Sequence, residues 1–354
     1  MDVLHRRLLL IAFFCNNVLS ENNIVWHGGG MKCENKIMFF IDRKCETKNI
    51  IATKAVTTDT DILVMTPRFK SGVPATVWRL LKKPDGVHLM PLLDHSFHVI
   101  SDCSAVQNTV DFHLDTLGNL WILDTGMVDT LKNAKCTCHP KVLVLNVFVG
   151  EPKVKTIDLS SVVQPDSVLQ TLVVEYRMGS SPCMYVADAG VGRVIVHDVI
   201  SRAQWTVNAG APAPLIQLAL VNSNPGYNTL VAVKLNEPGW VEAQTAGLRQ
   251  NDSNTQFIPK NQHMPPLRLL GSDHHYIFFR YLNSAHVFAW KVRHPITKTS
   301  ALLIHEPEPP MRTASVELSR KKNYVILDTN FEDFMKNAEP VQKLSFVARI
   351  KSKV

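Results

Sequence analysis

The sequence predicts an all-β fold, and the spacing of its strand-like segments favours a six-bladed β-propeller. Short apolar runs bounded by Gly, Asp or Pro turn signals recur along the chain, at residues 120–124, 184–188, 276–279 and 324–328. Several precede a second apolar run across a polar break, which is typical of antiparallel strand pairs. At roughly 45 to 60 residues per unit, about six units fit the chain. A pair of β-sandwiches is the alternative fold with the same pattern.

The composition indicates a packed β domain that does not bind nucleic acid. Of the 354 residues, 45% are hydrophobic and 19% are charged, and 20 scattered prolines disfavour long helices. The net charge is +7, but the basic residues are dispersed along the chain. The dense basic cluster at 320–322 lacks interleaved aromatic residues that could stack on bases. We therefore expect no nucleic-acid partner.

The first twenty residues are predicted to be a signal peptide. Basic residues at 5–7 precede the apolar run Leu8–Phe14, and Val18 and Ser20 stand three residues and one residue before a cleavage site at Glu21. A buried N-terminal strand or helix is the alternative. No later segment has the ~18 uninterrupted apolar residues of a transmembrane helix, so we expect no membrane partner. The prediction is a secreted, extracellular protein whose residues 21–354 form a single β-propeller domain.

Cysteine usage agrees with an oxidising compartment. Six cysteines remain once the predicted signal peptide is removed, and this even number favours disulfides: Cys33, Cys45, Cys103, Cys136, Cys138 and Cys183. The short loop between Cys33 and Cys45 suggests a local bridge, while the other pairings stay open. Cys136 and Cys138 lack zinc-ligand spacing, so no metal and no cofactor is predicted. The N-D-S sequon marks Asn251 as a candidate glycosylation site.

Two histidine-containing patterns are predicted to have no catalytic role. The string W-H-G-G-G at 26–30 resembles an esterase oxyanion-hole motif, but the chain has no G-x-S-x-G nucleophile elbow. We expect a flexible mature N-terminus there. The pairs His274 with His275 and His95 with His98 are interpreted as surface or turn histidines rather than as metal ligands or bases.

Two aspartates and one arginine have competing structural and functional interpretations. Asp124 and Asp188 each end a strand run just before a turn, where a carboxylate can accept backbone N–H bonds. The alternative is that they approach the propeller channel and meet a cationic ligand or a metal. Arg68 precedes a Gly-Val-Pro turn, and a structural hairpin explains its segment.

Several of these motifs, in order, resemble the insect yellow and major royal jelly protein family. They are TPRFKSGVPATVWRL from residue 66, DCS from 102, LWILDTG from 120, CHPKVLV from 138 and YVAD from 185. The likeness is clear over roughly residues 60–200. It implies a six-bladed propeller closed by its termini, and it matches Cys103 and Cys138 to cysteines of the family. Some members bind biogenic amines in the channel, some resemble dopachrome-converting proteins, and others are structural or nutritive.

The resemblance implies a ligand site in the central channel. The predicted function is binding of a small aromatic or biogenic amine ligand, in a pigmentation, cuticle or secretory-fluid role, through stacking, cation–π contact and polar acceptors. The candidate ligand-binding residues are Thr329, Asn330, Phe331, Asp188 and Arg68. A blade-edge turn in which Asn330 bonds its own backbone is the alternative for the first three. A dopachrome-converting enzyme and a structural or storage protein are the alternative functions.

Overall fold

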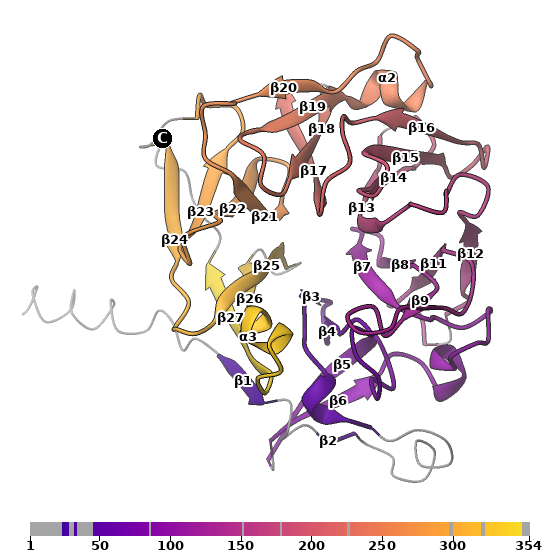
Figure 1. The fold of residues 1–354 in the computed structure, drawn as a ribbon, viewed down its shortest axis with the longest axis vertical. Helices are drawn as coiled ribbons and strands as arrows, with labels where there is room; N and C mark the ends of the chain where they lie inside the picture. The colour runs from indigo at the N-terminus through magenta and orange to yellow at the C-terminus, as the bar shows by residue number, and fades with distance from the viewer. Residues whose placement is uncertain are drawn as a thin grey trace, which may run out of the picture.

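A computed structural model describes residues 23–27, 32–33, 45–84, 86–150, 152–177, 179–224, 227–296, 300–319 and 323–348. The predicted signal peptide 1–20 and the basic cluster at 320–322 lie outside these residues. In the described part, six sheets stand around a central axis as the blades of a β-propeller (Figure 1). This confirms the predicted fold class and excludes the pair of β-sandwiches.

Each blade is an antiparallel sheet whose first strand lies innermost (Figure 1). The first three blades, from the inner to the outer strand, are β3 (Lys54–Thr57), β4 (Ile62–Met65), β5 (Val77–Lys83), β6 (Gly86–Pro91); β7 (Thr109–Leu114), β8 (Asn119–Asp124), β11 (Lys141–Asn146), β12 (Lys155–Asp158); and β13 (Leu169–Glu175), β14 (Cys183–Asp188), β15 (Arg193–Asp198), β16 (Gln204–Asn208). A short strand, β2 (Lys32–Cys33), pairs parallel with the outer edge of β6.

The other three blades repeat the arrangement. They are β17 (Ile216–Asn224), β18 (Tyr227–Lys234), β19 (Trp240–Gln244), β20 (Ile258–Lys260); β21 (Leu267–Ser272), β22 (Tyr276–Tyr281), β23 (Val287–Lys291), β24 (Ala301–His305); and β25 (Arg312–Leu318), β26 (Asn323–Thr329), β27 (Val341–Ala348), β1 (Ile24–His27). The loops that join these strands contain a small hairpin, formed by β9 (Met127–Val128) and β10 (Lys135–Cys136). They also contain the short helices η2 (Thr47–Asn49), η3 (His95–His98), α2 (Thr245–Arg249) and α3 (Phe331–Met335).

The apolar runs become strands because blades cover them on both faces. The second strand of a blade is buried along most of its length, as in β8 and β14, while outer strands such as β20 are exposed. A strand that packs against a neighbouring blade on each side needs apolar residues at consecutive positions, which explains the continuous runs in the sequence. Trp121 packs in the core between blades 2 and 3, and Trp290 in the core between blades 4 and 5.

The N-terminal strand closes the ring. In blade 6, β1 pairs antiparallel with β27, with Ile24 opposite Leu344 and Val25 opposite Lys343. Trp26 is 4% exposed within this strand. The prediction of a flexible segment was therefore wrong for Trp26 and His27, because their strand partner comes from the other end of the sequence. Pairing both termini in one sheet removes the free edges that an open ring would expose.

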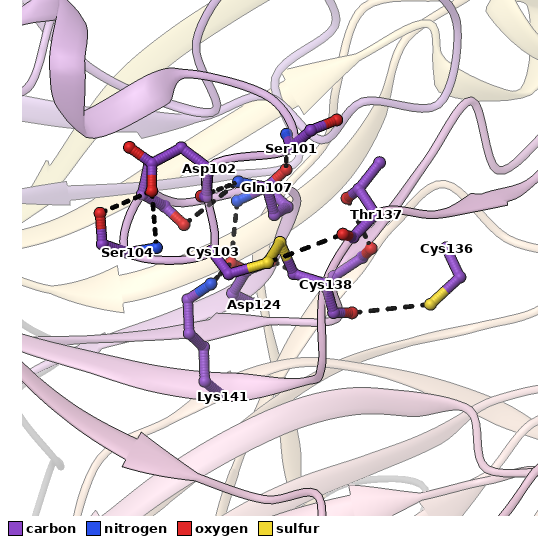
Figure 2. The surroundings of a disulfide bond; sticks show 12 residues. Ser101, Asp102, Cys103, Ser104, Gln107, Asp124, Cys136, Thr137, Cys138 and Lys141 are labelled. Atoms are coloured by element: carbon purple, nitrogen blue, oxygen red, sulfur yellow. Dashed lines mark hydrogen bonds and ion pairs between the residues drawn. A yellow bond between two sulfur atoms is a disulfide. The ribbon is translucent and has the colours of Figure 1, made fainter.

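One disulfide ties the loop before β7 to the loop before β11 (Figure 2). It joins Cys103 to Cys138, the two cysteines that the resemblance matched to the family. Cys45 is also disulfide-bonded, and the side chain of its predicted partner Cys33 lies outside the described residues. Cys136 and Cys183 are free thiols, so their predicted disulfides are wrong.

Geometry explains both free cysteines. Cys183 is buried within β14, in the apolar core between blades 3 and 4. Cys136 lies at the surface, and its thiol donates a weak hydrogen bond to the carbonyl of Cys138, 3.6 Å away (Figure 2).

In the described part of the chain, no helix combines the length and apolar character needed to cross a membrane.

Candidate functional site

The inner strands of all six blades line a central cavity of about 1590 Å³. Side chains from each blade reach it, among them Lys54, Asp111, Thr171, Gln217, Arg268 and Glu317. A cavity of this volume is large enough for a small organic ligand, which occupies a few hundred Å³. The channel is therefore the candidate binding site, and its two mouths differ in chemistry.

One mouth carries an aromatic wall beside α3. The rings of Phe69 and Phe331 are 5.4 Å apart between centroids and tilted by 56°, and both line the cavity together with Thr329 and Met335. Phe331 is the first residue of α3 and Phe69 belongs to the loop after β4. Two ring faces beside an open cavity form a surface on which a planar ligand can stack.

The same mouth holds three arginines and one carboxylate. Arg280 and Arg312 both pair with Glu332 on α3, at 3.4 and 3.0 Å. Arg268 lies directly opposite Arg280 in the pairing of β21 with β22. All four side chains line the cavity. Burial and the neighbouring Arg268 lower the pKa of Arg280 to about 10, so its guanidinium still carries its positive charge at neutral pH.

Gly271 allows blades 5 and 6 to approach closely enough to build this cluster. A Cβ atom at Gly271 would lie 1.9 Å from the carbonyl oxygen of Val316 on β25. Any side chain there would push β21 and β25 apart. The glycine thereby keeps Arg268 on β21 near Arg312 at the start of β25.

A buried ion-pair cluster joins the inner strands of three adjacent blades on the wall of the channel. Lys54 bridges Asp111 at 2.9 Å and Glu317 at 3.1 Å, which joins blades 1, 2 and 6. Burial alone would lower the pKa of Lys54, but the two carboxylates outweigh it and raise that pKa. Asp111 also accepts the backbone N–H of Leu172 at 2.8 Å. These partners stabilise the charges of the cluster and fix the positions of the three inner strands.

The opposite end of β7 presents a second polar group of side chains. The hydroxyl of Tyr176 donates to Asp115 at 2.5 Å, and the indole of Trp121 donates to the same carboxylate at 3.0 Å. These hydrogen bonds outweigh burial and lower the pKa of Asp115. Burial and the charge of Lys54 lower the pKa of His113 to about 4. His113 is therefore neutral at pH 7 and faces the cavity.

The structure brings two of the predicted ligand-binding residues to the cavity. Thr329 and Phe331 line it. Asn330 turns away: its amide donates to the Glu339 carbonyl at 2.6 Å, and its side-chain oxygen accepts from the Val341 backbone at 2.8 Å.

The other two candidates, Arg68 and Asp188, are bound within the loops that they support. The Arg68 guanidinium donates to five backbone carbonyls, those of Val73, Pro74, His98, Val106 and Gln107. Asp188 is fully buried and accepts from the hydroxyl of Ser167, the backbone of Val168 and the guanidinium of Arg193. Asp124 likewise accepts three backbone N–H bonds, from Gln107, Asn108 and Gly126. The contacts of Arg68, Asp124 and Asp188 are therefore those that the structural interpretation predicted.

Sequence reasoning missed the arginine cluster and the Lys54 cluster. Their members lie on separate strands whose contacts depend on blade packing. One usable signal existed: Arg268 and Arg280 each interrupt an apolar strand run, in LRLL and YIFFR, and a buried charge there requires a partner or a function.

No group of three or more His, Cys, Asp or Glu side chains in the described ranges is arranged to hold a metal ion.

Of the histidines interpreted as surface or turn residues, His274 and His275 are exposed in a turn. His98 is 3% exposed, so that interpretation was wrong for His98. The loop that carries η3 folds over it and buries Phe97 in the core shared by blades 1 and 2.

A family model described as Major royal jelly protein matches residues 107–217. The resemblance to the major royal jelly proteins is confirmed. The matched region covers blades 2 and 3 and the start of β17. The arginine cluster and α3 lie outside it.

A second comparison gives a curated relative with the same resemblance. Dopaminechrome tautomerase of Drosophila melanogaster is 29% identical over 152 residues, which cover 41% of this chain and 33% of the relative. The match thus spans about a third of that protein's length.

Among the solved structures, an arabinanase supports the fold and nothing beyond it. The α-L-arabinanase of Penicillium chrysogenum has a TM-score of 0.51 at 9% identity, covering 85% of this chain and 95% of the arabinanase. A luciferin-regenerating enzyme has a TM-score of 0.49 at 8% identity, covering 94% of this chain and 99% of the enzyme.

Proposed function

We propose that this major royal jelly-like propeller binds a small aromatic or biogenic amine ligand in its central channel, at the mouth beside α3. The observation that carries the proposal is the pair Phe69 and Phe331, whose rings stand 5.4 Å apart on the wall of the cavity. An aromatic ligand stacked there would bury its ring and leave its polar group among charged side chains. Thr329 lines the same cavity, and its hydroxyl can form a hydrogen bond with a polar substituent on the ligand ring.

We further propose that the protein is secreted, in a pigmentation, cuticle or secretory-fluid role. The Cys103–Cys138 disulfide supports an oxidising compartment. Asn251 is exposed just after α2 and accessible for a glycan. Mass spectrometry of protein collected from a culture medium tests both points. We expect a chain that starts near Glu21 and a glycan on Asn251, and an intact Met1 would contradict the proposal.

Calorimetric titration with serotonin and dopamine tests ligand binding. We expect saturable binding that Phe331→Ala weakens by about 1 to 2 kcal/mol through lost stacking and cation–π contact. Phe331→Leu keeps most of the apolar volume against Phe334, and it separates loss of the ring from loss of packing. Phe148→Ala, at an exposed turn outside the cavity, is the control and should bind as the parent does. Absence of saturable heat with these amines and with their carboxylate-bearing amino-acid counterparts would overturn the proposal.

A second candidate function is conversion of an aminochrome. It is favoured by the similarity to a dopaminechrome tautomerase and by His113, which faces the channel. Tautomerisation requires a group that removes a proton, and a neutral imidazole can accept one. The test is the decay of dopaminechrome with and without protein. Saturable acceleration that His113→Gln abolishes would support this candidate, and a rate equal to the uncatalysed one would remove it.

A further inference from the structure

The arginine cluster leaves positive charge without a partner inside the cavity mouth. Three guanidinium groups, those of Arg268, Arg280 and Arg312, lie near the single carboxylate of Glu332, which pairs only with Arg280 and Arg312. The cluster therefore has an excess of two positive charges. Glu332 lies on the surface side with its side chain 53% exposed, whereas the Arg280 side chain is 4% exposed. Surface carboxylates compensate buried charges only in part.

Two of these arginines also have unpaired donors. The Nε atoms of Arg268 and Arg280 are both buried and without a hydrogen-bond partner. In the described part of the chain, the side chain of Arg268 makes no hydrogen bond and no ion pair within 4 Å, and the charge of Glu332 acts on it only from a greater distance. It faces Arg280 across a strand pair, where like charges destabilise a sheet. Such an arrangement costs folding free energy, so a packing role does not explain it.

The cluster lies beside the aromatic wall. Glu332 follows Phe331 directly in α3, and Arg312 pairs with Thr329 across β25 and β26. A ring stacked on Phe331 would therefore have guanidinium donors next to its edge. Arginine binds carboxylates through paired N–H donors in a planar fork, which favours a carboxylate over a neutral group there.

We propose that Arg268, Arg280 and Arg312 bind a carboxylate group carried by the aromatic ligand. The inference rests on the proposed function, because it assumes that the ligand ring stacks at this mouth. It narrows the ligand class to aromatic amino acids or related aromatic carboxylates. A ligand with an ammonium group alone would meet repulsion from the excess positive charge.

A matched pair of probes tests the inference. 5-Hydroxytryptophan and serotonin share a ring and an ammonium group and differ by one carboxylate. We expect 5-hydroxytryptophan to bind at least about tenfold more tightly in calorimetric titrations, as one charge-assisted hydrogen-bonded pair provides. Equal affinities, or tighter binding of serotonin, would overturn the inference and leave the proposed function standing. Failure of both probes to bind would overturn both.

Arg268→Gln makes the test specific. It should lower the affinity for 5-hydroxytryptophan by about tenfold and leave serotonin binding equal or stronger. Its melting temperature should equal or exceed that of the parent, because the repulsion with Arg280 is relieved. Arg202→Gln removes one positive charge from an exposed turn outside the cavity and should change neither affinity. An Arg268→Gln protein that binds both probes as the parent does would overturn the role of the cluster.

Discussion

The ammonium of Lys70 lies 3.9 Å from the centroid of the Phe334 ring and donates to the carbonyl of the same residue at 2.9 Å. Lys70 belongs to the loop after β4, and Phe334 is the fully buried residue of α3. The pair thus connects blade 1 to the helix that joins β26 to β27 in blade 6. Because α3 also carries Phe331 and Glu332, this contact positions both the aromatic wall and the carboxylate of the arginine cluster.

Replacing Lys70 by methionine should loosen α3. We expect Lys70→Met to lower the free energy of unfolding by about 1 to 2 kcal/mol, through loss of a cation–π contact and of a charged hydrogen bond. Ligand affinity should fall as well. Thermal and urea unfolding measure the first effect and calorimetry the second. Lys48→Met, at an exposed lysine of η2, is the control, and equal losses in both variants would contradict the role of Lys70.

Ring closure should depend on Leu344 far more than on its neighbours in the pairing. Leu344 is fully buried opposite Ile24, so Leu344→Ala should cost about 2 to 5 kcal/mol of unfolding free energy. Val25 is exposed in β1, and Val25→Ala should cost less than about 0.5 kcal/mol. Removal of residues 344–354 should prevent folding or secretion. A truncated protein with parent stability would show that β27 does not close the ring.

The two free thiols should react in different states of the protein. Cys136 is exposed and should be alkylated in the native protein. Cys183 is buried, and burial raises the pKa of its thiol to about 11, so it should react only after unfolding. Peptide mapping after iodoacetamide treatment, with and without urea, distinguishes the two sites. Cys136→Ser should abolish native labelling at this position, and native labelling of Cys183 would contradict its burial.

Stability should fall below pH 6.5 in part because of His98. Its Nε2–H donates to the Leu92 carbonyl at 2.8 Å, and its Nδ1 is buried without a partner. Burial lowers the pKa of His98 from 6.5 to about 3. The unfolded chain therefore binds a proton between these values that the folded protein does not. The contribution of His98 to the free energy of unfolding is fully present above pH 6.5 and is lost as the pH falls toward 3. About 2 kcal/mol of it is lost by pH 5.

His98→Gln isolates this contribution. Glutamine keeps an N–H donor for Leu92 but does not titrate. Urea unfolding from pH 7.5 to 5 should show a smaller loss of stability for the variant than for the parent. Parallel curves for the two proteins would mean that His98 is not responsible for the pH dependence.

The fold could be predicted because local signals repeat. Runs such as 120–124 and 184–188 are continuous and end in an Asp-x-Gly turn, and the covered second strand of a blade requires such a run. The backbone-binding role of Asp124 follows from the same local chemistry. Strand pairing across the whole chain carries no local signal, which explains why residues 26–27 were interpreted as flexible.

The site was less predictable because its parts meet only in three dimensions. Thr329 and Phe331 were found through a family resemblance, and Asn330 was included although its side chain caps a turn. Arg268 and Arg280 become neighbours through the register of β21 with β22, and Arg312 joins them across the close contact at Gly271. The disulfide state of the cysteines could not be predicted for the same reason. The sequence around Cys183 does not distinguish a free cysteine from a bridged one.

The pairing of Ile24 with Leu344 sets an order for biosynthesis. Ile24 leaves the ribosome long before Leu344, because more than 300 residues lie between them. Five blades can assemble from neighbouring strands as the chain emerges, but the sixth needs both ends. Until then, the nascent chain holds β1 without its partner and the inner strands without a closed channel. A ligand that requires Phe69 and Phe331 together can therefore stabilise only the finished ring, and it cannot assist the earlier steps of folding.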